Sequence, residues 1–287
     1  MEVTLFNWSE SRWRVLQPAI YLVSILPVLA CVLLFENSRP LSEFLLVGVS
    51  VVLIQHAINV FNDDTDWEKG ADTEKSNSWF HFHRGNNSSM KRHAWISLLA
   101  GICLGIFLVV KANRSEILWV ALPLVLLGFL YNFSHLALSY TRWGEWVTGI
   151  CYGPGVFGCM AYFVHPQWSF DLLIGSLAFG FLAVAVLLSH QPPQILTDFA
   201  AGKMSFAVRQ GVEKTYLVAR WLTITSLILL TILFCGLDKP ALSNLCCVTI
   251  LVSAVVRLPK RLSPAVILKT ASLLLLAFGL LLKAGII

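Results

Sequence analysis

The sequence is poor in charged residues. Asp, Glu, Lys and Arg make up 13% of its 287 residues, whereas soluble domains carry roughly 25%. Hydrophobic residues make up 57%, and the mean hydropathy is +0.73. A soluble core cannot absorb this much apolar sequence. The composition therefore excludes an ordinary soluble domain and predicts an all-α polytopic membrane protein.

Metal-binding cysteine patterns are also missing. None of the seven cysteines forms a CxxC, and no Cys/His spacing suits zinc. His81-x-His83 has the spacing of two ligands, but no third partner is evident nearby. The net charge of +5 does not indicate nucleic-acid binding, because in a membrane protein the positions of the cations matter. We expect the cysteines to be small buried apolar side chains: Cys31, Cys103, Cys151, Cys159, Cys235, Cys246 and Cys247.

Long apolar segments are abundant, and a membrane span needs about 20 such residues. The chain is expected to form one domain over residues 1–287, with an uncleaved first helix. We predict nine transmembrane helices, at about 15–35, 41–61, 94–111, 116–133, 146–164, 170–189, 216–236, 241–257 and 265–285.

The basic residues predict the orientation. With a cytoplasmic N-terminus, 16 of the 21 Lys and Arg residues fall in cytoplasmic segments, as the positive-inside rule requires. Two cytoplasmic loops, 62–93 and 190–215, are long and polar, which suggests function. We therefore expect a multi-pass integral membrane protein, in the inner or plasma membrane if bacterial, with its active site on the cytoplasmic side.

The first long loop begins with a cluster of amides and carboxylates. Asn59, Asn62, Asp63 and Asp66 are three or four residues apart, so they share one face of a helix. Mg²⁺ prefers oxygen ligands, usually one or two carboxylates with substrate phosphate. The alternative is a solvated helix end. Four acids and two amides within eleven residues favour a magnesium-diphosphate site, with metal ligands Asn62, Asp63, Asp66 and Asp72 and nearby cations Lys69, Lys75 and Arg84.

The second long loop begins with a similar cluster. Gln194 and Asp198 are again four residues apart, and both are candidate metal ligands. Lys203 and Arg209 are cations suited to phosphate. A polar loop after a kinked helix is the alternative interpretation. Because the two clusters lie on the same predicted side of the membrane, we expect them to face one cavity.

Three further side chains are candidates near these clusters. Tyr131 and Asn132 lie at a predicted cytoplasmic helix end, where they would orient a phosphate or an acceptor hydroxyl, although interfacial aromatics more often serve as anchors. His190 precedes the second cluster and is a candidate for acceptor contact or proton removal. The catalytic candidates are thus Asp66, Asp198, Tyr131 and His190.

The motifs resemble those of the UbiA superfamily of intramembrane prenyltransferases, and most closely its 1,4-dihydroxy-2-naphthoate (menaquinone) branch. The first run, N-x-x-N-D-x-x-D-x-x-x-G-x-D, extends from Asn59 to Asp72. A second run, D-x-x-A-G-K-x-S/T-x-x-V-R-x-G, extends from Asp198 to Gly211. A loop ending in Gly144-Glu145 and the pair Gly153-Pro154 also match. The resemblance covers nearly the whole chain.

The resemblance implies nine helices around a central cavity. It also implies transfer of an isoprenyl group from an allylic isoprenyl diphosphate to an aromatic acceptor with Mg²⁺, within the lipid bilayer and in quinone biosynthesis. The diphosphate would contact Lys69, Lys75, Arg84, Lys203, Arg209 and Asn132.

The chain departs from the family pattern in several places. His190-Gln191-Pro192-Pro193 stands where the family has N-N-x-R, Gln17-Pro18 stands where it has R-P, and the loop after the first motif lacks the usual R-x-G-P run. The second motif of the family is D-x-x-x-D, and its first acid is here Gln194. An amide oxygen still binds Mg²⁺, but without charge. Two alternatives follow, a prenyltransferase with a non-quinone acceptor and a catalytically degenerate prenyl-lipid-binding protein.

Overall fold

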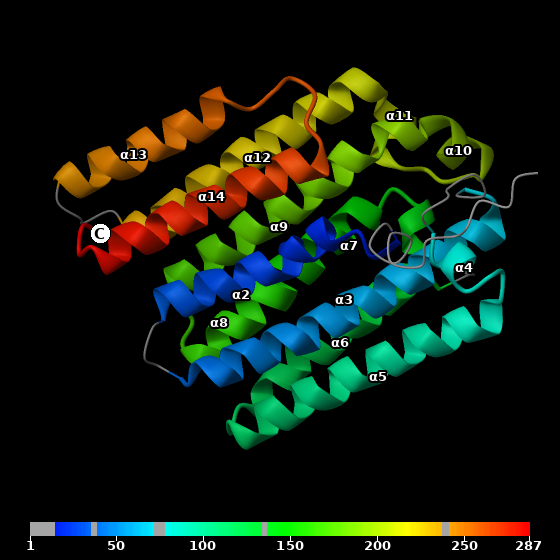
Figure 1. Cartoon of the computed structure of the whole chain (residues 1–287), viewed down its shortest axis with the longest axis horizontal. Helices are drawn as coiled ribbons and strands as arrows, with labels where there is room; N and C mark the ends of the chain where they lie inside the picture. The colour runs from blue at the N-terminus through cyan, green and yellow to red at the C-terminus, as the bar shows by residue number, and fades with distance from the viewer. Residues whose placement is uncertain (1–14, 36–38, 72–77, 134–136, 237–240) are drawn as a thin grey trace, which may run out of the picture.

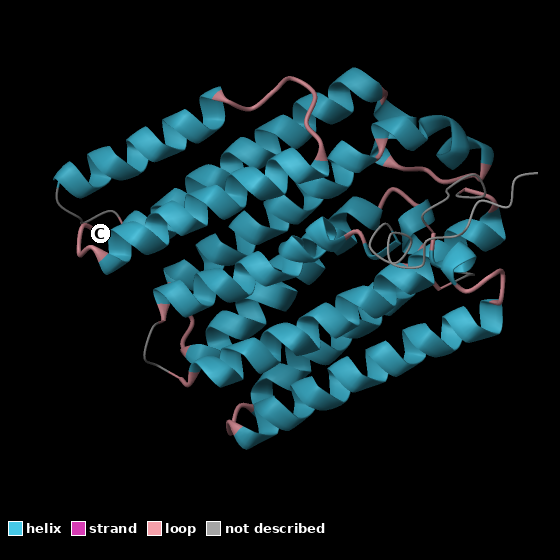
Figure 2. Ribbon diagram, viewed as in Figure 1, coloured by secondary structure: helices cyan, strands magenta, loops and turns pink. Residues whose placement is uncertain are grey.

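The computed structural model describes residues 15–35, 39–71, 78–133, 137–236 and 241–287, and these parts of the chain are helical with no strand (Figures 1 and 2). In chain order the elements are η1 (Pro18–Tyr21), α2 (Leu22–Leu34), α3 (Leu41–Lys69), α4 (Trp79–Phe82), α5 (Asn87–Lys111), η2 (Ser115–Ile117), α6 (Leu118–Leu130), η3 (Leu138–Tyr140), α7 (Gly144–Ile150), η4 (Cys151–Gly158), α8 (Cys159–Val164), α9 (Phe170–His190), η5 (Pro192–Gln194), α10 (Ile195–Ala200), α11 (Phe206–Gln210), α12 (Val212–Cys235), α13 (Ala241–Val256) and α14 (Pro264–Lys283).

Six of the predicted spans are confirmed as helices long and apolar enough to cross a membrane. Within the described ranges these are Leu41–Lys69, Asn87–Lys111, Gly144–Val164, Phe170–Ala200, Val212–Cys235 and Pro264–Lys283. The other three predicted spans coincide with shorter apolar helical segments, Pro18–Leu34, Ser115–Leu130 and Ser243–Val256. The predicted all-α class is thus correct, and six of the nine predicted spans meet the length and composition of a membrane-spanning helix in the described residues.

The bundle is built around α9. This helix packs against α12, η4, α7 and α14. One apolar core joins α9, α12, η4 and α14 to α2 and α8. Gly153 in η4 lies so close to α9 that a Cβ there would overlap the carbonyl oxygen of Ser176. The next residue, Pro154, has no N–H to donate, and the helix around it is of the π type over Cys151–Gly158.

A second, smaller core joins α3, α4 and α5, and α3 and α5 pack along their lengths. The helix α3 ends at Gly70, whose φ of 84° is left-handed. Ala71 N–H then donates to the carbonyl oxygen of Asp66 at 2.8 Å, which closes the last turn. Figure 1 shows α4, α10 and α11 at the same end of the bundle, so the two polar clusters of the sequence lie at one end.

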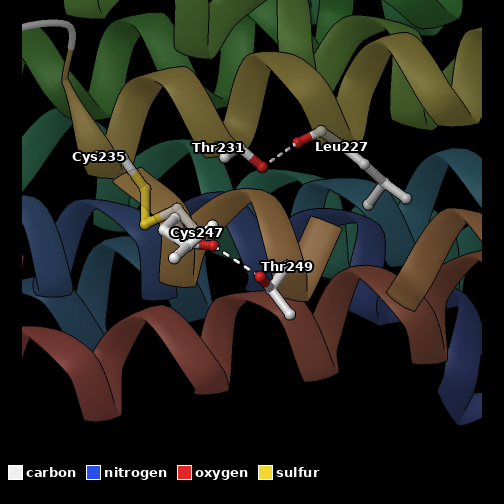
Figure 3. The surroundings of a disulfide bond; sticks show 6 residues. Leu227, Thr231, Cys235, Cys247 and Thr249 are labelled. Carbon is white, nitrogen blue, oxygen red and sulfur yellow. Dashed lines mark hydrogen bonds between the residues drawn. A yellow bond between two sulfur atoms is a disulfide. The ribbon is translucent and has the colours of Figure 1, made fainter. Parts of the chain in front are cut away.

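Three cysteines contradict the prediction that all seven are small buried apolar side chains. Cys235, the last residue of α12, forms a disulfide with Cys247 of α13 (Figure 3), with their Cα atoms 6.7 Å apart. Cys103 is unpaired but exposed. The disulfide could not be predicted from the sequence, because these two residues, 12 apart in the chain, meet only through the packing of α12 and α13. The bond lies at the end of the bundle away from α10 and α11.

Candidate active site

An ion pair joins the two long loops. Lys203, in the turn between α10 and α11, donates from Nζ to both carboxylate oxygens of Asp66 in α3, at 3.2 and 3.1 Å. The same Nζ lies 3.8 Å from Asp198 Oδ1. Both carboxylates are buried, at 2% and 3% relative exposure. The two predicted clusters therefore face each other across one ammonium group.

Local hydrogen bonds hold these groups in place. Asn62 donates from Nδ2 to Asp66 Oδ2 at 2.8 Å, as its position one turn earlier on α3 requires. Ser205 Oγ donates to Asp198 Oδ2 at 2.9 Å. Burial alone would lower the pKa of Lys203, but Asp66 and Asp198 outweigh it and hold that pKa above its ordinary value of 10.5. The ammonium is therefore charged at neutral pH.

Two adjoining cavities lie at this site. The smaller, of about 80 Å³, is polar, and Asp66, Asp198, Lys203 and Gln194 line it. The larger, of about 300 Å³, is mostly apolar and runs between α2, α3, α6, η4 and α9, with Tyr21 and Tyr152 in its wall. Both cavities share four lining residues, Asn62, Tyr131, Leu187 and His190.

Glu145 braces the second loop, a contact that the residue types in the sequence did not reveal. This buried carboxylate at the start of α7 accepts through Oε1 from the backbone N–H of Phe206 at 2.7 Å and from Gln191 Nε2 at 3.2 Å. Its Oε2 accepts from Arg209 at 3.3 Å. Gln191 also accepts from the N–H of Ala207 at 3.2 Å. In the sequence, only the match of Gly144-Glu145 to a family motif indicated that Glu145 has a role.

Two predicted site residues make hydrogen bonds that hold neighbouring elements together. Asp63 lines the larger cavity, and its Oδ2 accepts from the N–H of Trp79 at 2.8 Å. Asn132 forms two hydrogen bonds with α3. Its Nδ2 donates to the backbone carbonyl of Ile58 at 2.7 Å, and its backbone carbonyl accepts from Thr65 Oγ1 at 2.6 Å.

Like Asn132, three other predicted diphosphate ligands line neither cavity. Lys69 Nζ lies 4.3 Å from the ring centroid of Tyr140, Arg84 is exposed in the turn before α5, and Arg209 pairs with Glu145. Asp72 and Lys75 fall outside the described residues. The roles assigned to all these side chains remain predictions.

The donor set of the smaller cavity fits a hard cation. Its lining offers carboxylate, amide and hydroxyl oxygens, and Ser139 Oγ there is buried without a hydrogen-bond partner among the described residues. No group of three or more His, Cys, Asp or Glu in the described ranges is placed to hold a metal ion. The oxygen donors of the smaller cavity suit Mg²⁺, which is usually held by one or two carboxylates together with the phosphates of a substrate.

Comparison with known proteins assigns the chain to a class. The UbiA prenyltransferase family matches residues 24–278, so the chain belongs to this family, and the resemblance found in its motifs is confirmed. Since this is a membrane family and six helices of the described chain can span a bilayer, the protein is a multi-pass integral membrane protein.

Two curated relatives are named for naphthoate or naphthoquinone substrates. The chain is 28% identical to 1,4-dihydroxy-2-naphthoate octaprenyltransferase of Bacillus subtilis over 71% of its own length and 67% of the relative's. It is 27% identical to chloroplastic 2-carboxy-1,4-naphthoquinone phytyltransferase of Arabidopsis thaliana over 73% of its length, and this match spans only 57% of that protein.

The fold also matches solved structures. A UbiA homologue from Archaeoglobus fulgidus bound to GPP and Mg²⁺ superposes with a TM-score of 0.66 at 16% identity, over 96% of this chain and 99% of that one.

Proposed function

We propose that the protein transfers an isoprenyl group from an allylic isoprenyl diphosphate to an aromatic acceptor. The observation that carries this proposal is the joining of the two cavities. The polar cavity, with Lys203 between Asp66 and Asp198, suits a diphosphate, and the apolar one suits a hydrocarbon chain and an aromatic ring. The shared residues Tyr131 and His190 then lie where the two substrates would meet.

The residues of the chain support cleavage of the C1–O bond. Lys203 supplies a fixed positive charge to the leaving diphosphate. Mg²⁺, when bound with Asp66, Asp198 and the diphosphate, would neutralise further charge there. The tyrosine rings of the larger cavity would face the carbocation left on the isoprenyl group and stabilise it. The apolar walls exclude water, which would otherwise capture that cation.

The acceptor we propose is a hydroxylated naphthoate, in quinone biosynthesis. The two relatives described above carry naphthoate or naphthoquinone acceptors in their names. The main reason to consider a non-quinone acceptor is Gln194, which lines the polar cavity at the position of a family acid. We keep that acceptor class as the second candidate.

We further propose nine spans in a single domain, with the active-site end in the cytoplasm. The excess of Lys and Arg at that end supports this orientation. The Cys235–Cys247 disulfide supports it independently, because it lies at the opposite end of α12, and disulfides persist in oxidising compartments.

Purified protein tests the proposal directly. It would be incubated with Mg²⁺, isoprenyl diphosphates of several chain lengths, and 1,4-dihydroxy-2-naphthoate or other acceptors, with diphosphate release and prenylated product measured. We expect product with the naphthoate. Turnover only with a non-aromatic acceptor would favour the second candidate. Tight donor binding without turnover, unchanged in Asp66→Ala, would indicate a lipid-binding protein.

A further inference from the structure

Three histidines and a tyrosine form a continuous hydrogen-bonded chain outside the diphosphate site. Tyr21 OH lies 2.6 Å from His56 Nδ1, and His56 Nε2 lies 3.0 Å from His93 Nε2. His93 Nδ1 lies 3.1 Å from His83 Nε2, and His83 Nδ1 lies 3.0 Å from Ser89 Oγ. The five residues come from η1, α3, α5 and the turn before α5.

This hydrogen-bonded series of side chains runs from the large cavity towards the active-site end of the bundle. Tyr21 lines that cavity, whereas His83 and Ser89 are half-exposed at the start of α5. Trp79 fixes the two inner rings edge-on, with centroid distances of 4.9 Å to His56 and 5.2 Å to His93. The rings are therefore held in line rather than free to rotate outward.

The ring nitrogens face one another in pairs, which is the geometry of proton transfer and not of metal binding. No His, Cys, Asp or Glu group among the described residues converges on a metal position. A neutral imidazole carries one N–H and one bare nitrogen. The four hydrogen bonds are all satisfied when every N–H points towards Ser89, and equally when every N–H points towards Tyr21. Changing from the first arrangement to the second moves one proton along the whole chain.

The cavity wall beside Tyr21 also has a vacant acceptor. Gln55 Nε2 donates to the carbonyl oxygen of Ile20 at 3.1 Å, while its Oε1 is buried without a hydrogen-bond partner among the described residues. Gln55 lines the same cavity as Tyr21. A hydroxyl-bearing ring in this cavity would find an oxygen acceptor next to the head of the histidine chain.

We propose that Tyr21, His56, His93 and His83 form a relay that carries a hydroxyl proton of the aromatic acceptor out of the cavity. This rests on the proposed prenyl transfer. The ring carbon bonds to C1 of the isoprenyl group, the C1–O bond breaks with its electron pair on diphosphate, and the acceptor O–H bond breaks with its pair entering the ring. Its proton passes to the Tyr21 oxygen, as the Tyr21 proton passes to His56 Nδ1.

The remaining steps repeat the same exchange. The His56 Nε2 proton passes to His93 Nε2, and the His93 Nδ1 proton passes to His83 Nε2. The His83 Nδ1 proton leaves to water beside Ser89, and every N–H then points towards Tyr21. Burial and the neighbouring His93 hold the pKa of His83 below its ordinary value, which keeps that ring neutral between turnovers.

Two measurements on the purified full-length protein separate this relay from a structural role. One is prenyl transfer to the hydroxylated acceptor. The other is positional isotope exchange of ¹⁸O within the donor diphosphate, which reports C1–O cleavage and return without needing the acceptor proton to leave. The variants are Tyr21→Phe, His93→Gln and the double variant. The control is His81→Gln, because His81 is exposed on α4 and lies outside the histidine chain.

We expect Tyr21→Phe and His93→Gln each to slow transfer by at least about tenfold, since positioned proton acceptors contribute large factors, while isotope exchange stays at the wild-type rate. The double variant should be no slower than either single variant, because a broken relay cannot be broken twice. His81→Gln should behave as wild type.

A wild-type rate of prenyl transfer in His93→Gln would overturn the relay. So would additive losses of transfer rate in the double variant, or a loss of isotope exchange as large as the loss of transfer. Absence of isotope exchange and transfer in the wild type itself, with every isoprenyl diphosphate tried, would instead overturn the proposed function and the relay with it.

Discussion

Lys203 places its ammonium nitrogen within 3.2 Å of both carboxylate oxygens of Asp66, although 137 residues separate them in the chain. The ion pair is mostly buried, with side-chain exposures of 15% and 3%. Asp66 in α3 and Lys203 in the α10–α11 turn therefore both line the smaller cavity. The positive charge that the turn brings is the only protein cation lining the smaller cavity among the described residues.

Lys203→Gln should destabilise the protein. It leaves two buried carboxylates without their cation, and breaking such a pair costs about 3–5 kcal/mol. Adding Asp66→Asn should restore part of that loss, which denaturation in detergent would measure. The pKa of Lys203 is raised on folding, so its contribution is fully present below 10.5 and is lost only as pH rises through the higher folded value. Equal stability of Lys203→Gln and wild type at neutral pH would contradict this.

Asp66→Asn should lower turnover on the order of a hundredfold to a thousandfold, because Asp66 holds Lys203 and would hold Mg²⁺, and losing one positioned contact to a developing charge has an effect of that size. The variant should still fold, because the amide fits the same space. Glu68→Gln is the matched control, since Glu68 lies on the same helix but pairs with Lys91 at 2.7 Å outside both cavities. Steady-state rates of diphosphate release check both variants, and similar losses in the two would argue against a special role for Asp66.

Gln194→Asp should strengthen Mg²⁺ binding. A carboxylate adds a charged oxygen at a position that lines the polar cavity, and ligand charge sets the affinity for hard cations. We expect the half-saturating Mg²⁺ concentration to fall by about tenfold. An unchanged metal titration would show that the Gln194 side chain takes no part in the metal site.

Arg209→Ala and Glu145→Ala should have similar effects. The structure ties Arg209 to Glu145, which also accepts from the backbone of Phe206, so either change loosens the α11 end of the loop. We expect the KM for the donor to rise by roughly tenfold in each, equivalent to about 1.4 kcal/mol, with no further rise in the double variant. A much larger effect of Arg209→Ala alone would mean that Arg209 contacts the diphosphate itself.

Cys247→Ser should lower stability without changing turnover. A disulfide of this kind stabilises by about 2–4 kcal/mol, and it lies at the end of the bundle away from the site. Thermal unfolding with and without reductant measures the first effect. Equal thermal stability of Cys247→Ser and wild type, with no effect of reductant on either, would contradict a stabilising disulfide.

The sequence by itself determined the class, the helical segments and the two polar clusters. Apolar segment length and helical spacing are local properties, so Asn62 and Asp66 could be placed on one face, and the structure joins them by a hydrogen bond. The positions of the predicted spans match apolar helices throughout the described chain. Their lengths were less predictable, because three helical segments are shorter than a full span and packing sets where a helix begins and ends.

Only the tertiary structure decided which distant groups meet. The contact of Lys203 with Asp66, the bracing of Phe206 by Glu145 and the disulfide of Cys235 each join segments whose relative position depends on how helices pack. The histidines show this most clearly. His81 and His83 looked like an incomplete metal pair in the sequence, yet His83 bonds to His93, which bonds to His56 on another helix. Helical periodicity relates residues within about one turn of each other, whereas these contacts arise from the way α3, α4 and α5 pack together.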